Sequence, residues 1–190
     1  MKFGIGQSAA RVEDRQLLVG AGCFSDDVAP GQGLRIAFLR APHAHARMRT
    51  PDVSAARKLA GVHLVATQAD LDAENIGDIE CQFCPPLIGG GEMQLVSKPA
   101  MARDIIRHAG DIIAMVAAET EDIAESAIEL IEVEYQPMPA VTDIYAAMAD
   151  DAPQLYTCYP NNIAFKWGAG DLDGADQAMK GAIALSLIHI

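Results

Sequence analysis

Long apolar runs, aromatic side chains and basic residues are all scarce in this sequence of 190 residues. No apolar run approaches the ~20 residues that span a bilayer, and the opening segment MKFGIGQSAARVEDR lacks the apolar core of a secretory signal. The chain has 14 basic residues against 26 acidic ones, which gives a net charge of −12. Binding to nucleic acid depends on clustered Lys and Arg. We therefore expect a cytoplasmic protein with no membrane span and no nucleic-acid partner.

Cysteine is also rare, with four residues at Cys23, Cys81, Cys84 and Cys158. Without a secretory signal, free thiols are expected rather than disulfides. The spacing Cys81-x-x-Cys84 occurs in zinc ribbons, but a ribbon needs a second such pair. A thioredoxin-like site needs the pair at the start of a helix, and here Pro85-Pro86 follows instead. We expect two thiols in a loop; a small thiol or metal protein built on them is the weaker alternative.

The pair His43-x-His45 would place two imidazole rings on the same side of a strand, as in some metal sites. A third ligand is not evident in the sequence. We therefore expect both rings to contact backbone carbonyl groups near a strand end.

The glycine and aspartate motifs also lack the partners that their chemistry needs. Gly4-x-Gly6 has neither a preceding strand nor the third glycine of a dinucleotide site, and Gly89–Gly91 lacks the Lys-Ser/Thr of a phosphate-binding loop. Asp26 and Asp27 have no base beside them. From these patterns we assign no catalytic, cofactor-binding or metal-ligating residue.

The clearest structural pattern runs from Arg107 to Val141. Ile112–Ala118 is almost continuously apolar, which is typical of a strand buried on both faces. Thr120 then has the position of a helix N-cap, and the helix that follows has an apolar stripe of Ile123, Ala127, Leu130 and Ile131. Alternation resumes at Val133 and Tyr135, and prolines end it. The pattern predicts a strand, a helix and a second strand that need a wider sheet beside them.

The other expected elements complete an α+β fold. Leu34, Ile36 and Phe38 share one face of a predicted strand that ends at Arg40. The remaining expectations are an extended segment over 43–48, a short helix over 55–59, a strand over 62–67, a helix ending near 71, a long loop over 75–99, a helix over 143–148 and a helix over 173–183.

Several short segments resemble one known family in the order in which they occur. They are Gly6-Gln7-Ser8 with Arg11-Val12-Glu13-Asp14; Gly20-x-Gly22-x-Phe24-x-Asp26-Asp27; Leu39-Arg40-x-Pro42-His43-Ala44-His45-Ala46; Pro51-Asp52-x-Ser54-x-Ala56; Gly61-Val62; Gly110-Asp111 with Val116-Ala117-x-Glu119-Thr120; and Val133-Glu134-Tyr135-x-Pro137-x-Pro139-Ala140-Val141. Together they resemble the large subunit of molybdenum hydroxylases, namely xanthine dehydrogenase, aldehyde oxidase and aerobic carbon-monoxide dehydrogenase. The opening Arg11–Asp14 and the ending Asn162, Trp167 and Gly170-Asp171 are most similar to the bacterial carbon-monoxide-dehydrogenase type.

The resemblance implies an N-terminal arm (1–19), an α/β hammerhead domain (20–141), a linker (142–160) and a truncated start of the molybdopterin-binding domain (161–184). It implies a parent oxidoreductase that hydroxylates a carbon centre with oxygen from water. Its cofactors would be molybdenum–molybdopterin, with iron–sulfur clusters and FAD on partner subunits, and its large subunit would have a dimer partner. The family's base and pterin loops lie downstream of residue 190, so the fragment itself is expected to be inactive and without cofactors.

The last residues carry two further expectations. The segment LSLIHI (185–190) resembles the translated end of a transposon adapter, so we expect it to be a non-native tail. Ile163, Phe165, Trp167 and Ile183 would expose apolar surface meant for missing strands, which predicts poor solubility. The alternative is a stand-alone, non-catalytic interaction domain with the same hammerhead fold.

Overall fold

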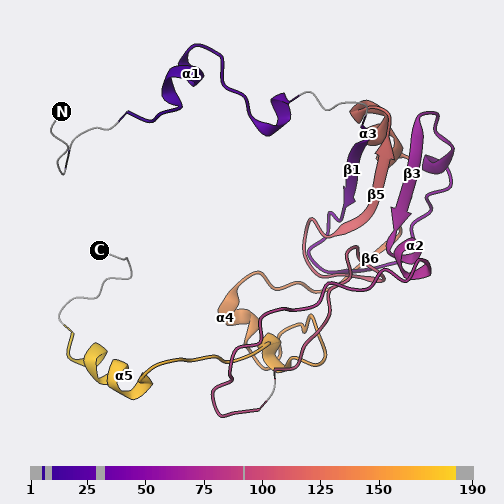
Figure 1. Cartoon of the computed structure of the whole chain (residues 1–190). Coiled ribbons are helices and arrows are strands. Elements are labelled where there is room, and N and C mark those ends of the chain that lie inside the picture. The colour runs from indigo at the N-terminus through magenta and orange to yellow at the C-terminus, as the bar shows by residue number, and fades with distance from the viewer. Residues whose placement is uncertain (1–5, 7–9, 29–32, 92, 183–190) are drawn as a thin grey trace. The chain divides into compact units, whose positions relative to one another are not determined.

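The computed structural model describes residues 6, 10–28, 33–91 and 93–182, and the chain divides into two units at Leu34 (Figure 1). The first unit contains helix α1 (Asp14–Leu18) and the 3-10 turn η1 (Ser25–Asp27). The segment expected to be an N-terminal arm (1–19) therefore contains the short helix α1, where the lack of an apolar pattern would suggest an extended chain. Arg11 stabilises this turn because its Nε donates to Oδ1 of Asp14 at 2.9 Å.

The second unit is built on an antiparallel sheet of three strands in the order β1–β5–β3, seen side by side in Figure 1. These strands are β1 (Arg35–Arg40), β5 (Ile112–Ala118) and β3 (Val62–Thr67). All three match predicted strands. The long apolar strand β5 is central, which explains why nearly every one of its residues is buried or half-buried.

Helix α3 (Glu121–Glu129) packs on one face of this sheet. Its N-cap is Thr120, as predicted, because Oγ1 accepts a hydrogen bond from the Ile123 backbone N–H at 3.3 Å. Ala124 and Ala127 are fully buried against the sheet. Leu130, predicted on the buried stripe, is exposed instead because the helix ends before it and Leu130 serves as the C-cap. The core beneath α3 consists of Val53, Ala56, Val65, Ala114, Val116, Ala118, Ala124, Ala127 and Ile131.

A second, smaller sheet has the order β4–β2–β6 and comprises β4 (Ile105–Ile106), β2 (Ala46–Met48) and β6 (Tyr135–Pro137). The strand predicted from Val133 begins later, at Tyr135, and includes Pro137 rather than ending before it. Proline is tolerated there because β6 is an edge strand. The core under this sheet consists of Ala41, Ala46, Met48, Ala102, Ile106 and Ile113.

The remaining elements are short. They are η2 (Ala56–Lys58), α2 (Gln68–Ala73), α4 (Ile144–Ala147), η3 (Pro160–Asn162) and α5 (Leu172–Lys180). Helix α5 is shorter than predicted and is capped by Asp171, whose Oδ1 accepts from the Gly174 N–H at 2.8 Å. The expected non-native tail (185–190) and Ile183 lie outside the described residues. Among the residues described, no helix has the length and apolar content needed to cross a membrane.

Strand β1 has the alternation that the sequence predicts, but Ile36 and Phe38, the pair expected to share a face, lie on the side away from α3. Ala37 and Leu39 pack against the core beneath α3, whereas Ile36 and Phe38 are exposed. The side chains under α3 are mostly alanine and valine, and this lets the helix lie close to the sheet.

Ile113 is fully buried between the two sheets, so truncating it tests this packing. We expect Ile113→Ala to lower the free energy of unfolding by about 2–5 kcal/mol, because burial is lost and a cavity remains. The matched control is Ile144→Ala, at a side chain that is 76% exposed, which should change it by less than about 0.5 kcal/mol. Equal effects of the two changes in urea titrations would contradict this core.

Candidate functional site

The two cysteines of the Cys81-x-x-Cys84 motif are free and exposed, in a stretch without helix or strand. Sγ of Cys81 donates to the Phe83 carbonyl oxygen at 3.2 Å. The expectation of two thiols in a loop is confirmed, and the helix start that a thioredoxin-like site needs is not present at these residues. Cys23 is also a free, exposed thiol, and Cys158 is a free, half-buried one.

The two histidines have different roles, and neither lies within a strand, because β2 begins at Ala46. His45 is buried, and its Nδ1 lies 2.7 Å from the Pro139 carbonyl oxygen. A carbonyl oxygen can only accept, so Nδ1 carries the proton. His43 instead makes an edge-to-face contact with Tyr135, with ring centroids 4.9 Å apart. The prediction of a carbonyl contact is confirmed for His45 and wrong for His43, whose neighbour is an aromatic ring.

The other sequence motifs also have structural roles or no described partner. Gly4 lies outside the described residues. The three glycines of Gly89–Gly91 all have positive φ, which explains glycine there without any phosphate. Oδ2 of Asp27 accepts from the Phe24 backbone N–H at 2.9 Å, so this carboxylate caps a turn.

Arg103 is the centre of the strongest polar cluster in the described residues, and the sequence patterns did not reveal it. Its guanidinium group contacts both carboxylate oxygens of Asp72 (2.9 and 3.1 Å) and both of Asp78 (2.7 and 3.2 Å). The hydrogen bonds from Arg103 lower the pKa of both carboxyl groups, and the bond with Asp78 contributes most to raising the pKa of Arg103. Both aspartates therefore stay ionised and paired at neutral pH.

Gln68 connects this cluster to the protein interior. Its side chain is almost fully buried, donates to Oδ1 of Asp72 at 2.9 Å and accepts the Met101 N–H at 2.8 Å. Ser97 adds a hydrogen bond to Asp78 at 2.9 Å. We call Gln68, Asp72, Asp78, Ser97 and Arg103 the Arg103 clasp. It joins helix α2 to both ends of the long connection between Asn75 and Pro99.

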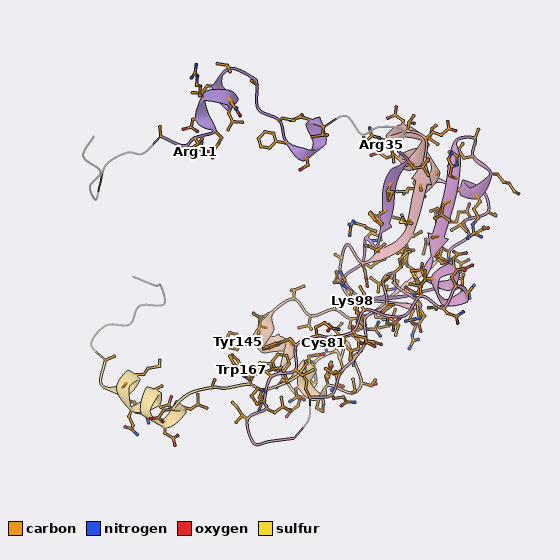
Figure 2. The ribbon with its side chains drawn as sticks, in the orientation of Figure 1. Arg11, Arg35, Cys81, Lys98, Tyr145 and Trp167 are labelled. Carbon is orange, nitrogen blue, oxygen red and sulfur yellow. The ribbon has the colours of Figure 1, made fainter. Side chains whose placement is uncertain are left out.

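Further contacts order this connection, which we call the excursion (75–99). Ile79 and Lys98 exchange two backbone hydrogen bonds of 2.7 and 3.1 Å that close its base. Farther out, the Ile88 N–H donates to the Lys166 carbonyl oxygen at 3.0 Å, and the Tyr159 hydroxyl donates to the Gln94 carbonyl oxygen at 2.8 Å. Figure 2 labels Cys81 and Lys98 on the excursion and Trp167 on the segment that pairs with it.

In the segment that follows α4 (148–162), the side chain of Asn162 forms three hydrogen bonds with backbone groups. Asn162 accepts the Leu155 N–H at 2.9 Å and donates to the carbonyl oxygens of Ala147 and Pro153 at 2.9 and 3.0 Å. Its φ of 55° lies in the left-handed region, which asparagine tolerates better than most residues. Arg107 adds a cation–π contact, with its guanidinium carbon 4.4 Å from the Tyr156 ring centroid.

None of these arrangements among the described residues fits a metal or a molybdopterin. No three His, Cys, Asp or Glu side chains in the described part of the chain come together as metal ligands. One groove described there, of about 410 Å³, is open and is lined in part by the paired side chains of Arg49 and Glu134. The described chemistry is that of a structural domain with polar clasps.

The comparison with known families is decisive for identity. The family model "aldehyde oxidase and xanthine dehydrogenase, a/b hammerhead domain" matches residues 19–139. The chain belongs to this family. Its α+β hammerhead fold, expected from the sequence, is thereby confirmed.

The individual relatives match this chain over a small share of their own length. It is 34% identical to the carbon monoxide dehydrogenase large chain of Afipia carboxidovorans, over 96% of this chain and 23% of the relative. It is 32% identical to the nicotine 6-hydroxylase large subunit of Paenarthrobacter nicotinovorans, over 90% of this chain and 20% of the relative. This hammerhead chain therefore spans about a quarter of the length of the curated relatives it matches.

Solved structures of proteins named as oxidoreductases or dehydrogenases also match this chain in fold and sequence. The crystal structure of the Cu,Mo-CO dehydrogenase matches with a TM-score of 0.64 and 32% identity, over 95% of this chain and 23% of that one. Quinoline 2-oxidoreductase from Pseudomonas putida 86 matches with a TM-score of 0.62 and 38% identity, over 80% and 19%.

The role of the Arg103 clasp can be tested by measuring how often the base of the excursion opens, through hydrogen exchange of its backbone amides. We expect Arg103→Gln to speed amide exchange at Ile79 and Lys98 about fivefold or more, because the excursion loses its link to α2. Arg49→Gln, which removes an exposed ion pair with Glu134, is the matched control and should leave both amides unchanged. Unchanged exchange in Arg103→Gln would show that the backbone pairing holds the excursion by itself.

The Arg103 clasp also predicts that the excursion becomes less stable at acidic pH. The pKa values of Asp72 and Asp78 are lowered in the folded protein, so their contribution to stability is present above about pH 4, the unfolded value. This contribution is lost as the pH falls through the lower pKa values that the two aspartates have in the folded protein. Exchange at Ile79 and Lys98, corrected for intrinsic rates, should therefore accelerate below about pH 4 in the wild type and less in Arg103→Gln. Parallel pH profiles would argue against ionised aspartates as the cause.

Proposed function

We propose that this chain is the leading part of the large subunit of a molybdenum hydroxylase. It would comprise the hammerhead domain (20–141), a linker (142–160) and the start of the molybdopterin-binding domain (161–184). The observation that carries the proposal is the match to a carbon monoxide dehydrogenase large chain along 96% of this chain but 23% of the relative. Such asymmetry is what a portion of a longer subunit would give.

The parent protein would be an oxidoreductase that hydroxylates a carbon centre with oxygen from water. Names of the relatives support this class, since they include a nicotine hydroxylase and a nicotinate dehydrogenase molybdopterin subunit. The proposed cofactors of the parent are molybdenum–molybdopterin, with iron–sulfur clusters and FAD on partner subunits. A second large subunit and a cytoplasmic location complete this proposal.

Within that parent, the role of the described residues is structural. The strongest carboxylate cluster is held by Arg103, and the buried His45 is bound to a backbone carbonyl oxygen. The carboxylates are paired with a guanidinium group, and the His45 ring is buried away from solvent, so neither is positioned to act on a substrate as a general base. The described residues do not fit the molybdenum cofactor, so no step of the reaction is assigned to them.

The test compares the chain alone with the product of its parent gene. We expect the purified 190-residue chain to contain no molybdenum and to show no dye-linked oxidation of aldehydes, purines or carbon monoxide. The full-length large subunit, expressed with its neighbouring genes, should contain about one molybdenum per chain by elemental analysis. Turnover by the short chain, or a full-length protein without molybdenum, would refute the proposal.

A further inference from the structure

The main sheet has an apolar face opposite helix α3. Successive residues of a strand point to opposite faces, and the register pairs Ile36 and Leu64 with Ala117, one row from Phe38 and Met115. These rows form one continuous patch across all three strands. Its exposed rim is Ile36, Phe38 and Leu64, and its floor is the buried Ala66 and Ala117 with the half-buried Met115. We call these six residues the open face.

The largest side chains of the open face are well exposed. Ile36 is 58% exposed, Phe38 43% and Leu64 48%. Beside Phe38 lies Arg40, whose guanidinium carbon is 5.7 Å from the Phe38 ring centroid, and Leu64 lines a groove together with Arg57, His63 and Asp70. Arg40 also donates to the Gly110 carbonyl oxygen at 3.0 Å. The patch is therefore apolar, with Arg40 at the margin near Phe38 and the ion pair of Arg57 and Asp70 at the margin near Leu64.

The same side of the sheet is already covered at one end. Ile113, two residues before Met115 on β5, is fully buried against Ala46, Met48 and Ile106 of the second sheet. The open face is thus the uncovered continuation of a layer that is buried at Ile113.

An antiparallel sheet with one face in water normally presents polar residues there. Here β1 presents Ile36 and Phe38 outward, and β5 is apolar on both faces. Large apolar patches on a domain surface mark places where another surface packs. The composition is that of a sheet covered on both sides.

We propose that the open face packs against the downstream polypeptide of the same large subunit, through an apolar segment of that polypeptide. This rests on the proposed function. The curated relatives are about four times as long as this chain, since the match covers 23% of the first, so the same polypeptide offers ample surface. A covalently linked segment also acts at a high effective concentration.

A second copy of the chain is the less suitable occupant. Each copy has a net charge of −12, and like charges oppose close association of two copies. The carboxylate that shares a groove with Leu64, Asp70, is already paired with Arg57 at 2.6 Å and so is not free for Arg40 of a second copy.

Accessibility of single introduced thiols tests the proposal. Leu64→Cys places a thiol on the open face, and Phe38→Cys is a second site in case one variant folds poorly. The matched control is Glu125→Cys, at an exposed position on α3 on the other side of the sheet. Each variant is prepared in the 190-residue chain and in the full-length large subunit, and reaction with N-ethylmaleimide is followed peptide by peptide to separate it from the native cysteines.

We expect the open-face thiols to react at least about tenfold more slowly in the full-length subunit than in the short chain, and the Glu125→Cys thiol to react similarly in both. Equal rates at Leu64→Cys in a full-length subunit that contains molybdenum would overturn the docking and leave the proposed function intact. Protection in a full-length protein without molybdenum would overturn the proposed function alone. Protection already present in the short chain, rising with its concentration, would identify a second copy and overturn the proposal. A gene that ends at residue 190 would overturn both.

Discussion

The close packing of helix α3 on strand β5 is the contact on which the second unit depends. Ala124 and Ala127 of the helix meet Ala114, Val116 and Ala118 of the strand, and all five are buried. Small side chains on both surfaces allow a short distance between helix and sheet, and a larger residue at any of them would force the two layers apart. In the loop before β3, Gly61 has a φ of 84°, in the left-handed region that favours glycine.

Outside this apolar core, the excursion is held mainly by hydrogen bonds and ion pairs. The excursion (75–99) contributes few buried side chains, so it cannot be held by apolar burial alone. The Arg103 clasp supplies charge-assisted hydrogen bonds instead, and buried Gln68 anchors them to the interior. Hydrogen bonds rather than a buried core therefore hold this connection, which is rich in proline and glycine.

The sequence predicts the elements of this unit better than it predicts their partners. The strand Ile112–Ala118 and the cap at Thr120 are visible because apolar runs and N-caps are local signals. The clasp is not visible, because Asp72 and Arg103 are brought together by the fold across a long separation. The only local sign near it is the box Thr67-x-x-Asp70 at the start of α2. Asn162 was likewise missed, since its three backbone partners depend on the path of the chain.

The least predictable feature was which face of β1 packs against the core. This orientation matters for the proposed function, because it decides which side chains stay exposed. Alternation alone shows that Ile36 and Phe38 share a face but not which face meets the core. The structure places Ala37 and Leu39 inside and Ile36 and Phe38 outside, so much of the apolar area of β1 stays in water. The largest side chains that are fully buried are Ile106, Ile113, Gln68 and Val116, and none of them is aromatic. Burial of alanine and valine contributes less free energy than burial of larger side chains. A domain with this distribution gains most by covering its outer face, which is how a structural module is expected to behave inside a subunit several times its size.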